Sequence, residues 1–168
     1  NKIVGKKRLL RFMSLNGNDL TFTGERFVPG IDDYKLEMEH IQRYRMAKLL
    51  TENKTVLDAA CGEGYGSALL AENAKQVIGV DISEESISHA RYRYSDKENL
   101  QFEVKDISHL NGVETGSMDV VVSFETIEHI SKDTQKKFLK EIKRVLKKDG
   151  LLIMSTQNKK IYSDMFDY

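Results

Sequence analysis

Glycines and carboxylates gather in one short stretch of the sequence, residues 55–70, TVLDAACGEGYGSALL. It begins with an apolar, β-branched run, Thr55–Ala60, which has the length of a buried strand, and it ends in residues that favour a helix. Between them, Gly62, Gly64 and Gly66 allow positive φ angles and remove Cβ atoms that would hold a ligand away. The predicted helix adds unpaired N–H groups at its start. This order of strand, glycine-rich turn and helix indicates a loop that binds a nucleotide cofactor.

The spacing and the charge of this loop argue against a dinucleotide. Its glycines follow the pattern GxGxG, whereas the dinucleotide fingerprint GxGxxG would place its third glycine at Ser67. Asp58 and Glu63 bracket the loop, and Asp81 ends the next predicted strand. These carboxylates would repel a diphosphate, but they would attract S-adenosylmethionine, which has no phosphate and carries an ammonium and a sulfonium.

Two segments, DAACGEGYG from Asp58 and GVDIS around Asp81, resemble motif I and the second-strand acidic motif of class I S-adenosylmethionine-dependent methyltransferases. The resemblance implies that Asp58 holds the cofactor ammonium, directly or through water, and that Asp81 accepts both ribose hydroxyls. It also implies that Ile82 packs on the adenine, with a core position for Ile82 as the alternative. The backbone around the methionine moiety would come from Ala60, Cys61, Gly62 and Gly64.

Two later segments extend this resemblance. Asp106 and Ile107 match the family's third-strand position, where the carboxylate takes the adenine amino group and the next backbone N–H reaches a ring nitrogen. A turn cap is the alternative role for Asp106. The segment SFETIEHI, which contains Phe124, resembles the motif after the fourth strand and would therefore lie beside the sulfonium.

The same segment supplies the candidate catalytic residues, Glu125 and His129. Methyl transfer is an in-line displacement on an activated carbon, so alignment can supply most of the acceleration. A base is needed only if the acceptor loses a proton during attack. His129 is our candidate for that base, because histidine exchanges protons near neutral pH, and a structural role for His129 is the alternative.

A metal site in this segment is a second possibility. Glu125, Glu128 and His129 form ExxEH, which resembles three of the magnesium or manganese ligands in small-RNA 3′-terminal 2′-O-methyltransferases. That family needs another histidine downstream, and no histidine follows His129 in this sequence. Metal-independent quinone and sugar methyltransferases carry similar EHI or EHV segments, so we predict no metal.

The elements that must position these residues alternate along the chain. The alternation predicts an α/β fold, a Rossmann-like, doubly wound parallel sheet of strand order 3-2-1-4-5 with the cofactor over strands one and four. The family usually adds strands six and seven, which are apparently missing here, so we expect a fragment of a longer polypeptide. The predicted strands are residues 55–60, 76–81, 100–104, 118–124 and 151–156, with helices starting near residues 67, 83 and 131.

Residues 1–52 precede the predicted core of residues 53–168, and they contain a basic arm, the loop TGERFVPG at 23–30 and a predicted helix at 34–50. The loop and helix resemble the N-terminal segment of bacterial methyltransferase domains found with glycan- and sugar-modifying enzymes. The resemblance makes Arg26, His40 and Tyr44 candidates for a cofactor lid or substrate entrance. The alternative is that Arg26 forms a salt bridge and that His40 and Tyr44 lie on an ordinary packed helix face.

The composition limits the partners. The chain has 168 residues and a net charge of zero, so nothing global favours nucleic acid or an anionic membrane. Cys61 is the single cysteine, which indicates a reducing, cytoplasmic setting. The resemblance described above implies that S-adenosylmethionine donates its methyl group to a hydroxyl or amine of a sugar, glycan or small metabolite, leaving S-adenosylhomocysteine. A cofactor-binding module without catalysis, inside a larger glycan-assembly protein, is the non-enzymatic alternative.

Overall fold

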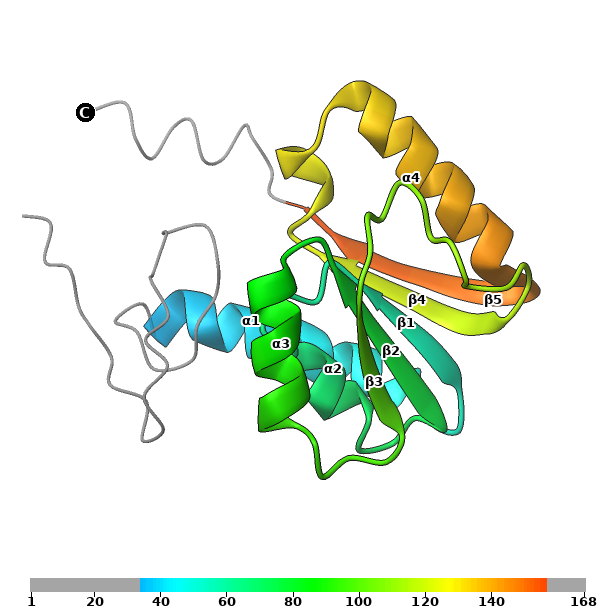
Figure 1. Ribbon diagram of the computed structural model, residues 1–168. Helices are drawn as coiled ribbons and strands as arrows, with labels where there is room; N and C mark the ends of the chain where they lie inside the picture. Colours follow the sequence, from blue (N-terminus) through cyan, green and yellow to red (C-terminus); the bar gives the residue numbers. More distant parts are fainter. Residues whose placement is uncertain (1–33, 157–168) are drawn as a thin grey trace, which may run out of the picture.

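The computed structural model describes residues 34–156, with side chains from residue 40 onward. Over this range, five parallel strands form one sheet in the order β3-β2-β1-β4-β5, with helices on both faces (Figure 1). The predicted fold class and strand order are confirmed. Arg26 and the loop at 23–30 lie outside the described residues. The strands are β1 (Thr55–Ala59), β2 (Gln76–Asp81), β3 (Leu100–Val104), β4 (Met118–Phe124) and β5 (Leu146–Ser155).

Helices α1 (Tyr34–Leu49), α2 (Tyr65–Leu70) and α3 (Glu84–Arg93) cover one face of the sheet, and α4 (Lys132–Val145) covers the other, after a short 3-10 helix η1 (Ile127–His129). The predicted starts of α3 and α4 are confirmed. Each is capped by a serine hydroxyl that accepts a backbone N–H in the first turn, Ser83 from Ser86 at 3.3 Å and Ser131 from Thr134 at 3.2 Å.

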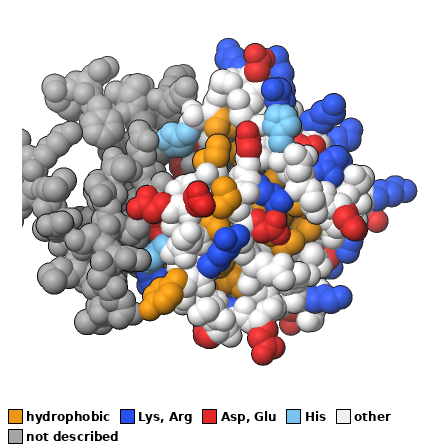
Figure 2. Space-filling model, viewed as in Figure 1, with side chains coloured by type: hydrophobic (Ala, Val, Ile, Leu, Met, Phe, Trp, Pro, Cys, Tyr) orange, Lys and Arg blue, Asp and Glu red, His pale blue; other side chains and the backbone are white. Residues whose placement is uncertain are grey.

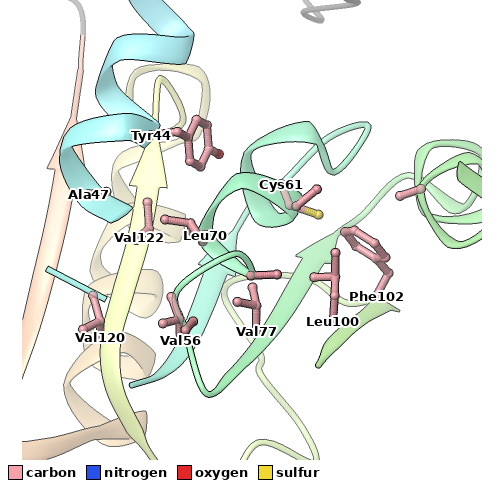
Figure 3. Packing of buried hydrophobic residues seen from close by; sticks show 14 of the residues in the cluster. Tyr44, Ala47, Val56, Cys61, Leu70, Val77, Leu100, Phe102, Val120 and Val122 are labelled. Carbon is pink, nitrogen blue, oxygen red and sulfur yellow. The ribbon is translucent and has the colours of Figure 1, made fainter. Parts of the chain in front are cut away.

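Two apolar clusters hold these layers together. Successive side chains of a strand point to opposite faces, so β1 places Val56 in one cluster and Leu57 in the other. Figure 3 shows the first cluster, in which Tyr44 and Ala47 of α1 pack near Leu70 of α2 and Val122 of β4. Helix α1 therefore belongs to the core that supports the sheet. The second cluster lies beneath α4.

Strand β5 begins earlier than predicted. We expected a turn at Asp149 and Gly150 followed by a strand from residue 151, but the chain is already extended at Leu146, with φ −67° and ψ 139°. Met118 pairs with Leu146 and Val120 with Leu151, so residues 147–150 bulge out of the ladder between them. The bulge holds the polar residues that resemble a turn in the sequence.

The outer surface of α4 is basic, as the sequence predicted. Figure 2 shows Lys and Arg side chains along the part of the molecule where α4 and β5 lie in Figure 1. The exposed lysines of α4 are Lys132, Lys136, Lys137, Lys140 and Lys143.

Of the helices in residues 34–156, none combines the length and hydropathy needed to span a bilayer.

Neighbouring residues of α4 offer a test of this packing. Phe138 is 0% exposed and Leu139 is 41% exposed. We expect Phe138→Ala to lower the free energy of unfolding by about 3–5 kcal/mol, because it removes a buried ring and leaves a cavity. The matched control Leu139→Ala should lower it by about 0.5 kcal/mol. Urea unfolding followed by circular dichroism measures both, and equal losses would contradict the assigned orientation of α4.

Candidate cofactor site

The candidate site lies at the carboxyl ends of β1 and β4, the two central strands. Strand β1 pairs with β2 on one side and with β4 on the other, so the winding of the sheet reverses between β1 and β4. The loop after β1 leads to α2 on one face, and the loop after β4 leads to α4 on the other. Doubly wound folds bind their ligands in the crevice at such a reversal, and we therefore place the candidate site, called the crevice below, between these two loops.

Both loops leave their strands through unusual backbone angles. Ala60, directly after β1, has φ 67°, and Glu125, directly after β4, has φ 50°. Non-glycine residues rarely adopt positive φ, and such positions, which cost roughly 1–3 kcal/mol, persist where the surrounding structure fixes them. The two sharp turns carry the chain away from the strand ends, toward α2 and α4.

The three glycines of the loop do different things. A Cβ on Gly62, which has φ 54°, would meet nothing within 4 Å, so this residue faces open space. A Cβ on Gly64 would collide with the ring of Phe102, and one on Gly66 would collide with the ring of Tyr44. Of the three, only Gly62 has open space at its Cβ position, whereas Gly64 and Gly66 allow the loop and the start of α2 to pack closely against β3 and α1.

Asp81 lies at the open end of β2. Its two carboxylate oxygens each accept a backbone N–H at 2.9 Å, one from Gly62 and one from Ser83. The next residue, Ile82, is 74% exposed, which contradicts the alternative of a core isoleucine. An anchored carboxylate and an exposed apolar side chain thus lie side by side in sequence at the mouth of the crevice.

Asp58 is fully buried behind the loop. Its Oδ2 accepts a hydrogen bond from Ser67 Oγ at 2.6 Å, and its Oδ1 accepts one from the Tyr44 hydroxyl at 3.2 Å. Burial, together with a smaller effect of the Asp81 charge, raises the pKa of Asp58 from 3.8 to about 6, against the opposing effect of these two hydrogen bonds. Asp58 thus lies beneath the surface that a ligand would contact.

Glu63 does not line the crevice, contrary to our prediction that it frames the cofactor. Its side chain is 3% exposed and turns toward α3. There its Oε1 accepts a hydrogen bond from Ser86 Oγ at 3.2 Å, and its Oε2 lies 2.5 Å from His89 Nδ1. These contacts fasten the glycine loop to α3. We did not predict the role of His89, whose only sequence signal is its position one turn after Ser86.

Tyr44 is buried, where we had predicted a lid or entrance. It is 4% exposed, and its ring packs edge-on against Tyr65 and Phe124, with centroid distances of 5.4 and 4.9 Å. The alternative of a packed helix face is therefore the one that the structure supports for Tyr44. Phe124 and Cys61 are also buried, and burial raises the pKa of the Cys61 thiol. His40 is half-buried.

The two candidate catalytic residues both follow β4, but they lie in different surroundings. Glu125 Oε1 accepts a hydrogen bond from Ser155 Oγ at 2.8 Å and lies 3.7 Å from Arg43 Nη2. His129 is exposed at the end of η1. Within the part of the chain that the structure describes, no three His, Cys, Asp or Glu side chains gather so as to hold a metal ion. The ExxEH segment is thus not assembled as a ligand set.

Asp106 follows β3 at the same edge of the sheet. Its Oδ1 accepts the backbone N–H of Ser108 at 2.7 Å, and this bond holds the pKa of Asp106 below its ordinary value. The turn-cap role is therefore present. Even so, the side chain is 48% exposed and can accept further hydrogen bonds. Ile107 is buried in the cluster beneath α4.

These residues fit S-adenosylmethionine. Gly62 faces open space, Ile82 offers an exposed apolar surface, and Asp81 and Asp106 present carboxylates along the same edge of the sheet. Hydroxyl and amino groups of an adenosine are suitable donors to such carboxylates. A parallel sheet of this order with an acidic, glycine-rich first loop defines the class of S-adenosylmethionine-dependent methyltransferases.

Comparison with known proteins identifies the family. The methyltransferase domain family matches residues 57–154, and the chain belongs to it. A probable S-adenosylmethionine-dependent methyltransferase of Mycobacterium tuberculosis is 40% identical over 146 residues, which cover 86% of this chain and 51% of the relative. The cofactor of this family is S-adenosylmethionine, as the sequence predicted.

Two further proteins show how far the similarity extends. A ubiquinone biosynthesis O-methyltransferase of Idiomarina loihiensis is 33% identical over 111 residues, covering 66% of this chain and 45% of that protein. The crystal structure of the PH0226 protein from Pyrococcus horikoshii OT3 superposes with a TM-score of 0.63 at 35% identity, covering 74% of this chain and 58% of the other. The chain thus spans about half the length of the curated relatives it matches.

The buried Asp58 predicts a pH dependence of stability. The folded chain binds the Asp58 proton more tightly than the unfolded chain, so this contribution is complete below about pH 4 and is lost as the pH rises through about 6. The loss is on the order of 3 kcal/mol. Asp58→Asn should remove this decline in the free energy of unfolding, measured by urea titration from pH 4 to 7. Asp133→Asn, at an exposed position, should keep it. A decline of equal size in Asp58→Asn would contradict the assignment.

Proposed function

We propose that this chain is the cofactor-binding part of an enzyme that transfers the methyl group of S-adenosylmethionine to a hydroxyl or amine of a sugar, glycan or small metabolite. The observation that carries the proposal is the Asp81 carboxylate, fixed by the N–H groups of Gly62 and Ser83 beside the exposed Ile82. The relative named for O-methylation in ubiquinone biosynthesis supports a small-molecule hydroxyl as one acceptor type.

The cofactor would be held along the carboxyl edge of β1, β2 and β3. In this proposal, Asp81 accepts the ribose hydroxyls, Ile82 packs on the adenine and Asp106 accepts the adenine amino group. The loop backbone at Ala60, Cys61, Gly62 and Gly64 surrounds the methionine moiety. Asp58 acts on the ammonium from beneath the loop, because a buried carboxylate is weakly screened and its field reaches the crevice.

Catalysis would rest mainly on alignment of the acceptor with the activated methyl carbon that the cofactor supplies. Effective molarities of well-oriented reactants correspond to about 7–11 kcal/mol of the barrier. We assign His129 as the base that takes the acceptor's proton, since it is exposed and follows the loop beside the crevice. Glu125, tied to Ser155 and close to Arg43, would fix the path of that loop.

The single buried thiol at Cys61 supports a reducing, cytoplasmic setting.

Replacing Asp81 tests the cofactor site directly. We expect Asp81→Ala to weaken binding of S-adenosylmethionine at least about tenfold in isothermal titration calorimetry, because the charge-assisted bonds to the ribose are lost. Circular dichroism should confirm that the variant folds. Asp96→Ala, on an exposed turn, should bind like the wild type. An unchanged affinity of Asp81→Ala would remove Asp81 from the ribose role.

Replacing His129 tests the assignment of the base. With labelled S-adenosylmethionine and a panel of sugar, glycan and quinol acceptors, we expect His129→Ala to lose about 10²–10⁴-fold in turnover without a change in cofactor affinity. Lys132→Ala, an exposed neighbour on α4, is the control. Normal turnover in His129→Ala would make this histidine structural.

Turnover that requires added magnesium or manganese would support the RNA methyltransferase alternative. Binding without turnover in the full-length polypeptide would support the non-catalytic module.

A further inference from the structure

We propose that Tyr44 is a positioning residue for cofactor binding, which acts by holding the Asp58 carboxylate and not by touching the cofactor. The inference rests on the proposed function, because it assumes that S-adenosylmethionine binds over the glycine loop. Asp58 has one hydroxyl donor on each carboxylate oxygen, Tyr44 at 3.2 Å and Ser67 at 2.6 Å. The two donors come from different helices, α1 and α2.

The Tyr44 ring is fixed from several sides. It packs edge-on against Tyr65 at 73° and Phe124 at 78°, and it fills the space that a Cβ on Gly66 would need. Figure 3 shows the ring extending from α1 toward α2. With 4% of its surface exposed, Tyr44 is buried, and its hydroxyl donates a hydrogen bond to Asp58. We infer that the hydroxyl acts on the cofactor site through this carboxylate. Burial raises the pKa of Tyr44, which keeps its hydroxyl protonated as a donor.

The groups around Asp58 make these two hydroxyls decisive for its charge. From β2, Asp81 faces Asp58 with a like charge, and the Cys61 thiol is the titratable neighbour on the loop. On α2, the Tyr65 phenol lies beside Tyr44. Burial also disfavours the carboxylate. Ser67 and Tyr44 are the groups that stabilise the ionised form. A cationic cofactor binds best to ionised Asp58, so loss of either donor should weaken binding where Asp58 is partly protonated.

Helix α1 also contacts both central strand ends. Arg43, the residue before Tyr44, lies 3.7 Å from Glu125 in the loop after β4. Adjacent residues of α1 thus reach Asp58 near the end of β1 and Glu125 directly after β4. This arrangement gives a helix outside the sheet a direct contact with each side of the proposed cofactor site.

The test is Tyr44→Phe, which removes the hydroxyl and keeps the ring. We expect its dissociation constant for S-adenosylmethionine, measured by calorimetry from pH 6 to 9, to rise about two- to tenfold at pH 7. The reason is that loss of a charge-assisted hydrogen bond raises the pKa of its acceptor, Asp58, by about one to two units. The difference from the wild type should vanish near pH 9, where Asp58 is ionised in both proteins. Ser67→Ala should behave in the same way. Tyr94→Phe, at a half-buried tyrosine that follows the C-terminal end of α3, should follow the wild-type curve.

Three outcomes would overturn the inference. If Tyr44→Phe and Ser67→Ala both follow the wild-type curve, the two hydroxyls do not govern the Asp58 charge. If the affinity of Tyr44→Phe is lower by the same factor at every pH, the Tyr44 hydroxyl does not act through the charge of Asp58. If the wild-type protein itself does not bind S-adenosylmethionine, the proposed function fails as well, and this result is distinguishable from the other two. Should Tyr44→Phe fail to fold in urea titration, Ser67→Ala alone decides between these outcomes.

Discussion

The structure around the crevice depends on the burial of one carboxylate, Asp58, at the end of β1. A buried ionisable group must be hydrogen-bonded or neutral, because water no longer stabilises its charge. Two hydroxyls meet this requirement, and their positions fix the start of α2 through Ser67 and the middle of α1 through Tyr44. The close approach of α1 then requires glycine at position 66. A single polar group thus constrains two helices and one glycine of the loop.

The acidic residues near the loop divide into two sets with different roles. Asp58 and Glu63 are buried, and each is bonded to side chains of the surrounding helices, so they hold the loop in place. Asp81 and Asp106 lie at the open edge of the sheet. Both carboxylate oxygens of Asp81 and one of Asp106 accept backbone N–H groups, and their remaining lone pairs face outward. This division gives the crevice a rigid support together with a negative surface, a combination that suits a cationic ligand better than a diphosphate.

The similarity to known methyltransferases covers the region that contains these groups. Residues 57–154 match the family, and they include both loops of the crevice and every acidic residue discussed above. Helix α1 lies before the matched region, yet Tyr44 contacts Asp58 of β1 and Arg43 lies close to Glu125 in the loop after β4. A segment outside the family match therefore helps to shape the proposed cofactor site, and this is why its contribution is easily missed in a comparison of motifs.

The order of the strands, the starts of α3 and α4, and the places of Asp81 and Gly62 could be predicted from the residues along the chain. Each of these depends on local periodicity, a cap within one turn, or the short path from a strand to the next helix. Four other features became visible only in the folded chain: Glu63 turns toward His89, Tyr44 is buried, Gly64 and Gly66 serve packing, and β5 starts at Leu146. These outcomes depend on side chains from elements far apart in the chain, and no pattern within a single segment records which neighbours it will meet.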